Sequence, residues 1–359
     1  MHTVRVRSFV CAAATATLVC VTPTFAQWTV TDLNPAGSTL STGAGASGAL
    51  QVGQARVGGI FRASLWSGTT ASWVDLSPAG ATASSARSAF GTQQVGDASI
   101  GGHTHAGFWS GSAASWVDLN PAGATSSSSI GSSGTQQVGE AVVSSHGSAS
   151  LWSGSAASWI NLDPGGTSAS YAYGTNGTQQ VGNVSLGGLV SHACMWSGTA
   201  ESFVDLSPAG STSSTARGIF GTQQVGVATI GGNDHAGLWN GTATSWVDLN
   251  PAGATNSFAI GTSGTQQVGD ATVGGLQRAS LWSGSADSWE DLSLALPGSW
   301  GTTFAAGISS DSTTLYIAGW GFNNISGQIE AVLWTRPIPA PGALGIFAFG
   351  AVAALRRRR

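Results

Sequence analysis

The sequence predicts an all-β protein, a seven-bladed β-propeller built from ~43-residue repeats and closed by strands from both ends of the chain. Three observations support this prediction. The hexapeptide Gly-Thr-Gln-Gln-Val-Gly recurs at steps of 43 or 44 residues, at 91–96, 134–139, 177–182, 221–226 and 264–269. An alanine stands three positions before each of seven repeated tryptophans, Trp66, Trp109, Trp152, Trp196, Trp239, Trp282 and Trp334. The repeat region also begins and ends with strands that lack a sequential partner.

The composition favours one large repetitive domain. The 359 residues include 53 glycines, and 8% of residues are charged, against about 25% in an average globular domain. Yet 42% of residues are hydrophobic and 15 are tryptophan, whereas disordered segments contain few aromatic residues. Apolar residues at regular intervals among small ones therefore indicate short strands joined by turns.

Each repeat divides into four strands. In the second copy we expect strands at 72–76, 84–90, 93–100 and 106–109. No stretch of the body has a 3.6-residue apolar period, so no helix is expected there. A six-residue link, Ser67–Ser72, joins the Leu-Trp strand of one copy to the Trp-Val-Asp-Leu strand of the next, and the link recurs at five later junctions.

The two unpartnered strands predict closure of a ring. The body begins with Val30–Leu33 and ends with Ala331–Trp334. A propeller whose last blade combines both strands pairs them and leaves no long exposed edge. An open β-solenoid is the alternative, since its repeats contact only their neighbours and need no matching ends.

The N-terminal 26 residues have the pattern of a secretory signal peptide. Arg5 and Arg7 provide the positive start, an apolar stretch covers 9–21, and cleavage is expected between Ala26 and Gln27. The propeller is then expected over 27–336. The C-terminal segment 337–359 contains a proline-rich motif, an apolar run over 342–355 and four terminal arginines.

This C-terminal segment resembles the bacterial PEP-CTERM sorting tail, although Ala340 stands where the family usually has Glu. The resemblance implies processing by an exosortase-type enzyme, with a sorting motif of Pro339, Ala340, Pro341, Arg356, Arg357, Arg358 and Arg359. Fourteen helical residues would span about 21 Å, less than the roughly 30 Å hydrocarbon layer. Terminal arginines favour the cytoplasmic side. We therefore expect an exported protein, at the cell surface or extracellular, anchored transiently through this tail.

The repeat itself resembles the extracellular HAF repeat. The resemblance rests on a His-Ala start, an Asp-Leu pair and a Gly-x-x-Gly-x-Gln-Gln-Val-Gly section, and it covers most of 28–334. The His-Ala start occurs at His105-Ala106, His192-Ala193 and His235-Ala236, and the other copies carry Arg62, Ser148, Arg278 and Glu330 in the His position. The resemblance implies an extracellular repeat protein and assigns no catalytic residue.

Several classes of chemistry are excluded. The chain contains no lysine, which rules out a phosphate-binding P-loop and Schiff-base catalysis. Between residues 27 and 336, six Arg face sixteen Asp and Glu, a balance of 6 − 16 = −10, so a nucleic-acid partner is not expected. Cys194 is the one cysteine outside the signal peptide and is expected to be a buried filler.

The repeated residues are expected to be structural. The aspartates of the Asp-Leu pairs should accept hydrogen bonds where a strand ends, although a ring of metal or sugar ligands is the alternative. No metal, cofactor or catalytic residue is expected, since a zinc site needs three or four converging ligands. Tryptophans that occur once per blade are expected in the core. The candidate interaction surface comprises residues that break the repeat, Trp300, Trp320, Tyr171 and Tyr173.

These observations predict a non-enzymatic surface or extracellular-matrix protein that acts as an interaction platform. The alternatives are a carbohydrate-binding module for extracellular polysaccharide and, third, a glycan hydrolase or lyase. The expected partners are signal peptidase, the exosortase-type enzyme, the membrane through the tail, and extracellular polysaccharide or other surface proteins.

Overall fold

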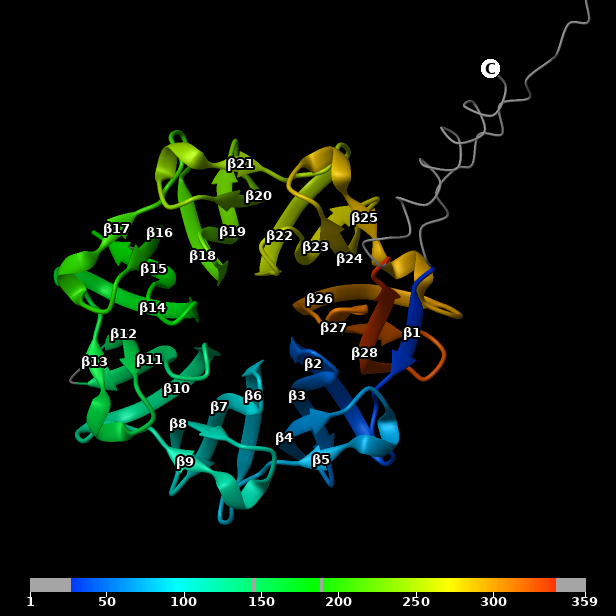
Figure 1. Cartoon of the computed structure of the whole chain (residues 1–359), viewed down its shortest axis with the longest axis horizontal. Helices are drawn as coiled ribbons and strands as arrows, with labels where there is room; N and C mark the ends of the chain where they lie inside the picture. Colours follow the sequence, from blue (N-terminus) through cyan, green and yellow to red (C-terminus); the bar gives the residue numbers. More distant parts are fainter. Residues whose placement is uncertain (1–26, 144–145, 188–189, 340–359) are drawn as a thin grey trace, which may run out of the picture.

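The computed structural model describes residues 27–143, 146–187 and 190–339. The described residues form seven four-stranded antiparallel sheets, arranged as blades around a central axis (Figure 1). This confirms the predicted seven-bladed propeller and rejects the open solenoid. The expected signal peptide, with its cleavage after Ala26, and the expected anchor at 340–359 lie outside the described residues.

Six blades use four consecutive strands, ordered from the axis outward. Blade 1 contains β2 (Ser38–Ser47), β3 (Leu50–Val57), β4 (Ile60–Trp66) and β5 (Val74–Asp75). Blade 2 contains β6 (Ala83–Phe90), β7 (Gln93–Ile100), β8 (His103–Trp109) and β9 (Val117–Asp118). Blade 3 contains β10 (Ala124–Ser132), β11 (Gln137–Val143), β12 (His146–Trp152) and β13 (Ile160–Asn161).

The next three blades repeat this order. Blade 4 contains β14 (Thr167–Thr175), β15 (Gln180–Leu186), β16 (Ser191–Trp196) and β17 (Val204–Asp205). Blade 5 contains β18 (Ser213–Phe220), β19 (Gln223–Ile230), β20 (Asn233–Trp239) and β21 (Val247–Asp248). Blade 6 contains β22 (Ala254–Thr262), β23 (Gln267–Val273), β24 (Leu276–Trp282) and β25 (Glu290–Asp291).

Blade 7 joins the two ends of the chain. It contains β26 (Trp300–Ser310), β27 (Thr314–Asn323), β28 (Gln328–Pro337) and, as its outermost strand, β1 (Thr29–Asp32). Val30 pairs with Trp334 and Thr31 pairs with Leu333. The predicted closure by the first and last strands is therefore confirmed, and Figure 1 shows β1 lying beside β28.

The outermost strands of blades 1 to 6 are shorter than predicted. In blade 1 the strand covers two residues, Val74–Asp75, because Thr70–Ser72 forms a short 3₁₀ helix, η1. The Ser72 hydroxyl stabilises this turn by accepting from the Ser67 amide at 2.7 Å and donating to the Thr69 carbonyl at 2.6 Å. Equivalent turns precede the outer strands of blades 2 to 6: η2 (Ala113–Ser115), η3 (Ala156–Ser158), η4 (Ala200–Ser202), η5 (Ala243–Ser245) and η6 (Ala286–Ser288).

One further 3₁₀ helix, η7 (Leu292–Ala295), follows β25. Over the described ranges, no helix has both the length and the apolar character that a membrane crossing requires.

The hexapeptide motif organises blades 2 to 6. In blade 2 the Gln94 side-chain oxygen accepts from the Gly111 amide at 2.8 Å, which ties the second strand to the link that follows the third. Val95 is fully buried. A Cβ atom on Gly96 would overlap the carbonyl oxygen of Ser85 on the adjacent inner strand. The motif therefore requires an amide acceptor, a core side chain and a glycine in that order.

The core lies between neighbouring blades. The seven repeated tryptophans are fully buried, as predicted for residues that occur once per blade. The alanine three positions earlier faces the next blade, and the Ala106 amide donates to the Ser127 hydroxyl at 2.9 Å. Cys194 is fully buried as expected, and this burial raises the pKa of its thiol well above the ordinary value.

Candidate functional site

The centre of the ring is a cavity lined by all seven inner strands. It has a volume of about 810 Å³, within the range of about 300–1,000 Å³ typical of ligand sites. Its lining comes from the second half of each inner strand and the turn that follows. Figure 1 shows these strands, β2, β6, β10, β14, β18, β22 and β26, surrounding the axis.

A β-bulge at the same place in each inner strand contributes one residue to this channel. In blade 2, Ala86 pairs with Gly96 and Ser88 pairs with Val95, so Arg87 has no paired residue between them. A bulge of this kind redirects a side chain. The seven bulged residues all line the cavity: Ala44, Arg87, Ile130, Tyr173, Arg217, Ile260 and Ala306. We call them the bulge ring.

The bulge ring concentrates positive charge. Among the described residues that line the cavity, the charged side chains are Arg87 and Arg217, and no Asp or Glu lines it. This contrasts with the acidic balance of the body, 6 − 16 = −10 over residues 27–336. The channel is therefore suited to an anionic group.

The two arginines differ in their partners. Arg87 pairs with Asp97 through its Nε atom at 2.6 Å. In blade 5 the residue equivalent to Asp97 is Val227, and no ion pair joins Arg217 to a carboxylate of the described chain. Arg217 instead lies over the Tyr173 ring, with its guanidinium carbon 4.4 Å from the ring centroid.

Of the four predicted interaction residues, Tyr173 lines the channel. Burial raises the pKa of its hydroxyl above the ordinary value, although the positive charge of Arg217 acts in the opposite direction. The phenol therefore stays neutral at physiological pH, and its ring supports the guanidinium by a cation–π contact. Tyr171 stacks on Tyr173 with ring centroids 6.1 Å apart, outside the cavity lining.

The two predicted tryptophans lie in blade 7, away from the tyrosines of blade 4. Trp320 stacks on Phe304 with ring centroids 4.0 Å apart. Trp300 donates its indole N–H to the Pro297 carbonyl at 2.9 Å and lines a smaller cavity of about 270 Å³ beside Arg278. The structure thus distributes the predicted interaction residues over two blades. Of the predicted sorting residues, Pro339 is exposed two residues after the end of β28, and the others lie outside the described residues.

Two exposed aromatic residues stand at the mouth of the channel. Phe90 and Phe220 end the inner strands of blades 2 and 5, and their exposed fractions are 54% and 56%. Each ring lies against a glycine of the following blade, Gly134 or Gly264, where a Cβ atom would approach it within about 3 Å. The mouth therefore offers apolar surface above the two arginines.

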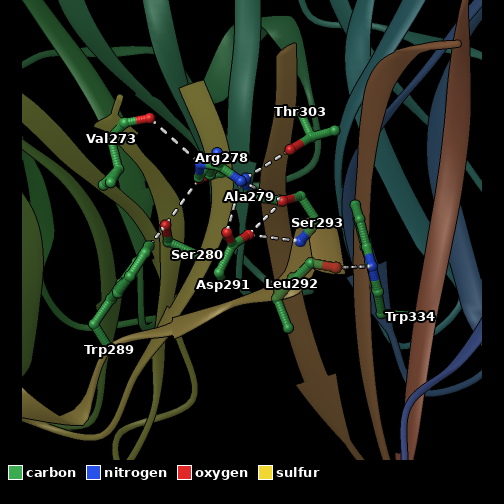
Figure 2. Close-up of polar contacts among 10 residues, drawn as sticks. All are labelled: Val273, Arg278, Ala279, Ser280, Trp289, Asp291, Leu292, Ser293, Thr303 and Trp334. Carbon is green, nitrogen blue, oxygen red and sulfur yellow. Dashed lines mark hydrogen bonds and ion pairs between the residues drawn. The ribbon is translucent and has the colours of Figure 1, made fainter. Parts of the chain in front are cut away.

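The repeated aspartates have the structural role that we expected. Figure 2 shows Asp291, which accepts from the Ser293 amide at 2.9 Å and from Arg278 at 3.0 Å. Equivalent backbone bonds occur in all seven blades, to Asp32, Asp75, Asp118, Asn161, Asp205 and Asp248 as well.

Histidine takes the place of Arg278 in three blades, where it pairs with the same aspartate, as His105 does with Asp118 at 2.7 Å. A guanidinium cannot act as a general base at neutral pH, because its pKa exceeds about 12. Since arginine fills the same position in two blades, these contacts stabilise the outer strand. No group of three metal-ligating side chains occurs within the described parts of the chain.

Comparison with known proteins gives structural relatives only. No protein-family model and no curated protein matches the sequence. The chain is similar to a Mycobacterium tuberculosis puromycin-hydrolyzing peptidase, at 13% identity and a TM-score of 0.55, over 86% of this chain and 56% of that one. It is also similar to a puromycin hydrolase mutant complexed with PGG, at 10% identity and a TM-score of 0.52, over 82% and 53% of the two chains.

The tricorn protease matches at 9% identity and a TM-score of 0.45, over 82% of this chain and 35% of that one. The chain spans about half the length of the two puromycin-hydrolysing enzymes. At these identities the likeness shows the propeller fold.

These relatives correct two expectations. The expected non-enzymatic surface or matrix platform, with its carbohydrate-binding and glycan-cleaving alternatives, is contradicted, because the two structures reported above with TM-scores over 0.5 are a puromycin hydrolase and a puromycin-hydrolyzing peptidase. The expectation that the chain is not an enzyme is contradicted by the same finding. The predicted interaction residues are ones that break the repeat, whereas the bulge ring occupies one equivalent position in every repeat.

Proposed function

We propose that this chain is a peptidase-related propeller that binds extended peptide in its central channel. The observation that carries the proposal is the bulge ring, which places two guanidinium groups, an aromatic ring and aliphatic side chains around one cavity. A peptide offers the complementary groups, since it combines carboxylates, apolar side chains and a hydrogen-bonding backbone.

The backbone of the channel also suits a peptide. Each inner strand is the last strand of its sheet on the side of the axis. An edge strand presents N–H and C=O groups that have no partner within the sheet, and extended peptides bind such edges through main-chain hydrogen bonds. Seven edges around one axis therefore offer main-chain partners along the channel.

The structural relatives support peptide as the ligand class. The two proteins that match with TM-scores of 0.52 and 0.55 are a puromycin hydrolase and a puromycin-hydrolyzing peptidase. The proposal assigns peptide binding to the channel of this chain and assigns no residue to hydrolysis.

The test is fluorescence anisotropy with a pool of labelled six-residue peptides. Ala306→Trp places a large side chain in the bulge ring and should weaken binding at least tenfold. Ala79→Trp, in an exposed turn outside the channel, is the matched control and should bind as the original chain does. Peptides that fail to bind, or that bind equally to both variants, would reject the proposal. Mass spectrometry of the incubated peptides would show whether bound peptide is also cut.

We also propose that the chain is exported and sorted by its C-terminal tail, with signal peptidase and an exosortase-type enzyme as its processing partners. The support is the signal-like pattern of residues 1–26, the PEP-CTERM-like layout of 337–359 and the similarity to HAF repeats. Mass spectrometry of the mature protein should find Gln27 as its first residue. Neutral residues in place of Arg356–Arg359 should disturb processing, because positive charge holds that end inside. A retained Met1 segment would reject export.

A further inference from the structure

We propose that Arg217 binds the C-terminal carboxylate of the peptide, so that the channel selects peptides by their free C-terminus. This inference rests on the proposed function of the channel. It identifies which chemical group of the ligand is recognised and which residue recognises it.

The first argument is the missing partner of Arg217. Blades 2 and 5 carry arginine at the same bulge, but Asp97 faces Arg87 where blade 5 has Val227. The carboxylate of Asp97 offsets the positive charge of Arg87 at the bulge of blade 2. The exposed Arg217 guanidinium therefore supplies the uncompensated positive charge of the cavity lining.

The second argument is the orientation of the guanidinium. Its carbon lies 4.4 Å from the centroid of Tyr173, and a guanidinium held over an aromatic face keeps the N–H groups at its edge available. Those N–H groups form a planar fork that matches the two oxygens of a carboxylate. Since less side-chain freedom remains to be lost on binding, the site is prepared for such a ligand.

The third argument is depth. Arg217 precedes the exposed Phe220 at the channel mouth by three residues on β18, which corresponds to about 10 Å along a strand. An extended peptide entering with its C-terminus first would bring its carboxylate to Arg217. An apolar side chain about three residues before that terminus would then contact Phe220. A terminal carboxylate fits this path better than a side-chain carboxylate, because it leads the chain.

The experiment measures the binding of three labelled hexapeptides to the purified chain by fluorescence anisotropy. The first has a free C-terminus and no acidic side chain, the second is the same peptide with a C-terminal amide, and the third is the amide with a final Glu. We expect the free acid to bind about tenfold or more tightly than the plain amide, because charge-assisted hydrogen bonds are lost with the carboxylate.

Matched variants identify the residue. Arg217→Ala should remove the preference for the free acid, and Arg217→Lys should restore part of it, because lysine keeps the charge without the fork. Val227→Asp reproduces in blade 5 the ion pair of blade 2 and should also remove the preference. Asp97→Val releases Arg87 and should increase the affinity for the free acid, an opposite effect that loss of folding cannot produce.

Each outcome decides between the claims. Equal binding of the free acid and the amide, or an unchanged preference in Arg217→Ala, would overturn this inference and leave peptide binding standing. If the amide with a final Glu binds as tightly as the free acid, the site recognises acidic side chains and selection by the C-terminus is wrong. Absence of binding by all three peptides would reject the proposed function and this inference together.

Discussion

The Ser41 hydroxyl accepts a hydrogen bond from the Ala331 amide at 2.9 Å, across 290 positions of sequence. The same contact joins every other pair of neighbouring blades: Ala63 to Ser84, Ala106 to Ser127, Ala149 to Ser170, Ala193 to Ser214, Ala236 to Ser257 and Ala279 to Thr303. The interface that closes the ring therefore uses the same contact as the interfaces between consecutive repeats.

Deleting residues 27–33 should destabilise the whole ring. The deletion removes β1 and the fully buried Leu33, whose amide donates to the Ala331 carbonyl at 2.8 Å. The outer edge of β28 is then exposed, which favours aggregation. Thermal unfolding and limited proteolysis of the deletion variant should show a lower midpoint and cleavage in all blades. Fraying confined to blade 7, with the other six protected, would show that the blades unfold independently.

The ring could be predicted because each repeated marker makes one contact per blade. The tryptophan fills the core, the alanine amide reaches the next blade, and the aspartate accepts the backbone bond after the outer strand. A residue that is needed in every blade leaves a period in the sequence. The outer strand at 72–76 was predicted too long, because the bonds of Ser72 that form the 3₁₀ turn cannot be distinguished from a strand start by pattern alone.

Gly96→Ala should destabilise the fold by about 2–4 kcal/mol. The new Cβ atom would overlap the Ser85 carbonyl oxygen, so the inner and second strands of blade 2 would have to separate. Gly301→Ala is the control, because its nearest neighbouring atom would lie at 3.5 Å, an ordinary contact, and its effect should stay within about 0.5 kcal/mol. Urea unfolding measures both. Equal stability of the two variants would show that the strands relax at low cost.

The channel could not be predicted from the sequence. Arg87 and Arg217 are 130 residues apart, and the bulge that turns them toward the axis does not change the apolar pattern of the strand. Trp300 and Trp320 break the repeat, which predicts an interaction role, yet neither lines the channel. One sequence feature does mark the bulged residues. In segments such as Ala-Tyr-Gly and Ala-Arg-Gly, a large side chain directly before the glycine interrupts a run of small ones.

Glu330→Gln should stabilise blade 7 by about 0.5–1 kcal/mol at pH 7. Glu330 occupies the position of Arg62 or His105 in other blades, so a carboxylate faces Asp32 where those blades place an arginine or a histidine. Burial is the main cause that raises the pKa of Asp32, and the charge of Glu330 raises it further. Glutamine can still accept from Ser326, as the carboxylate does at 2.6 Å. The exposed Glu201→Gln is the control in urea unfolding. A loss of stability in Glu330→Gln would mean that the bonds from Asn323 and Ser326, which use both carboxylate oxygens, outweigh the repulsion between Glu330 and Asp32.

The original chain should become less stable to unfolding as pH rises, because of Asp270. The variant Asp270→Asn should not show this decrease. Asp270 is 3% exposed, burial raises its pKa to about 7, and a bond from Gln277 at 3.4 Å only partly offsets this. Its unfolded-state pKa is near 3.8. Between these values the folded chain holds a proton that the unfolded chain has lost. The neutral acid's contribution is therefore fully present below pH 3.8 and is lost as pH rises through about 7.

Between pH 5 and pH 8 the original chain should lose roughly 2–3 kcal/mol of unfolding free energy relative to Asp270→Asn. Chemical denaturation at a series of pH values measures this difference. Asp287→Asn, which changes an exposed carboxylate on η6, should follow the pH dependence of the original chain. If Asp270→Asn shows the same decrease as the original chain, the Asp270 carboxyl is ionised at little cost. The contrast with Asp97, which has the Arg87 guanidinium beside it, would then have no energetic consequence.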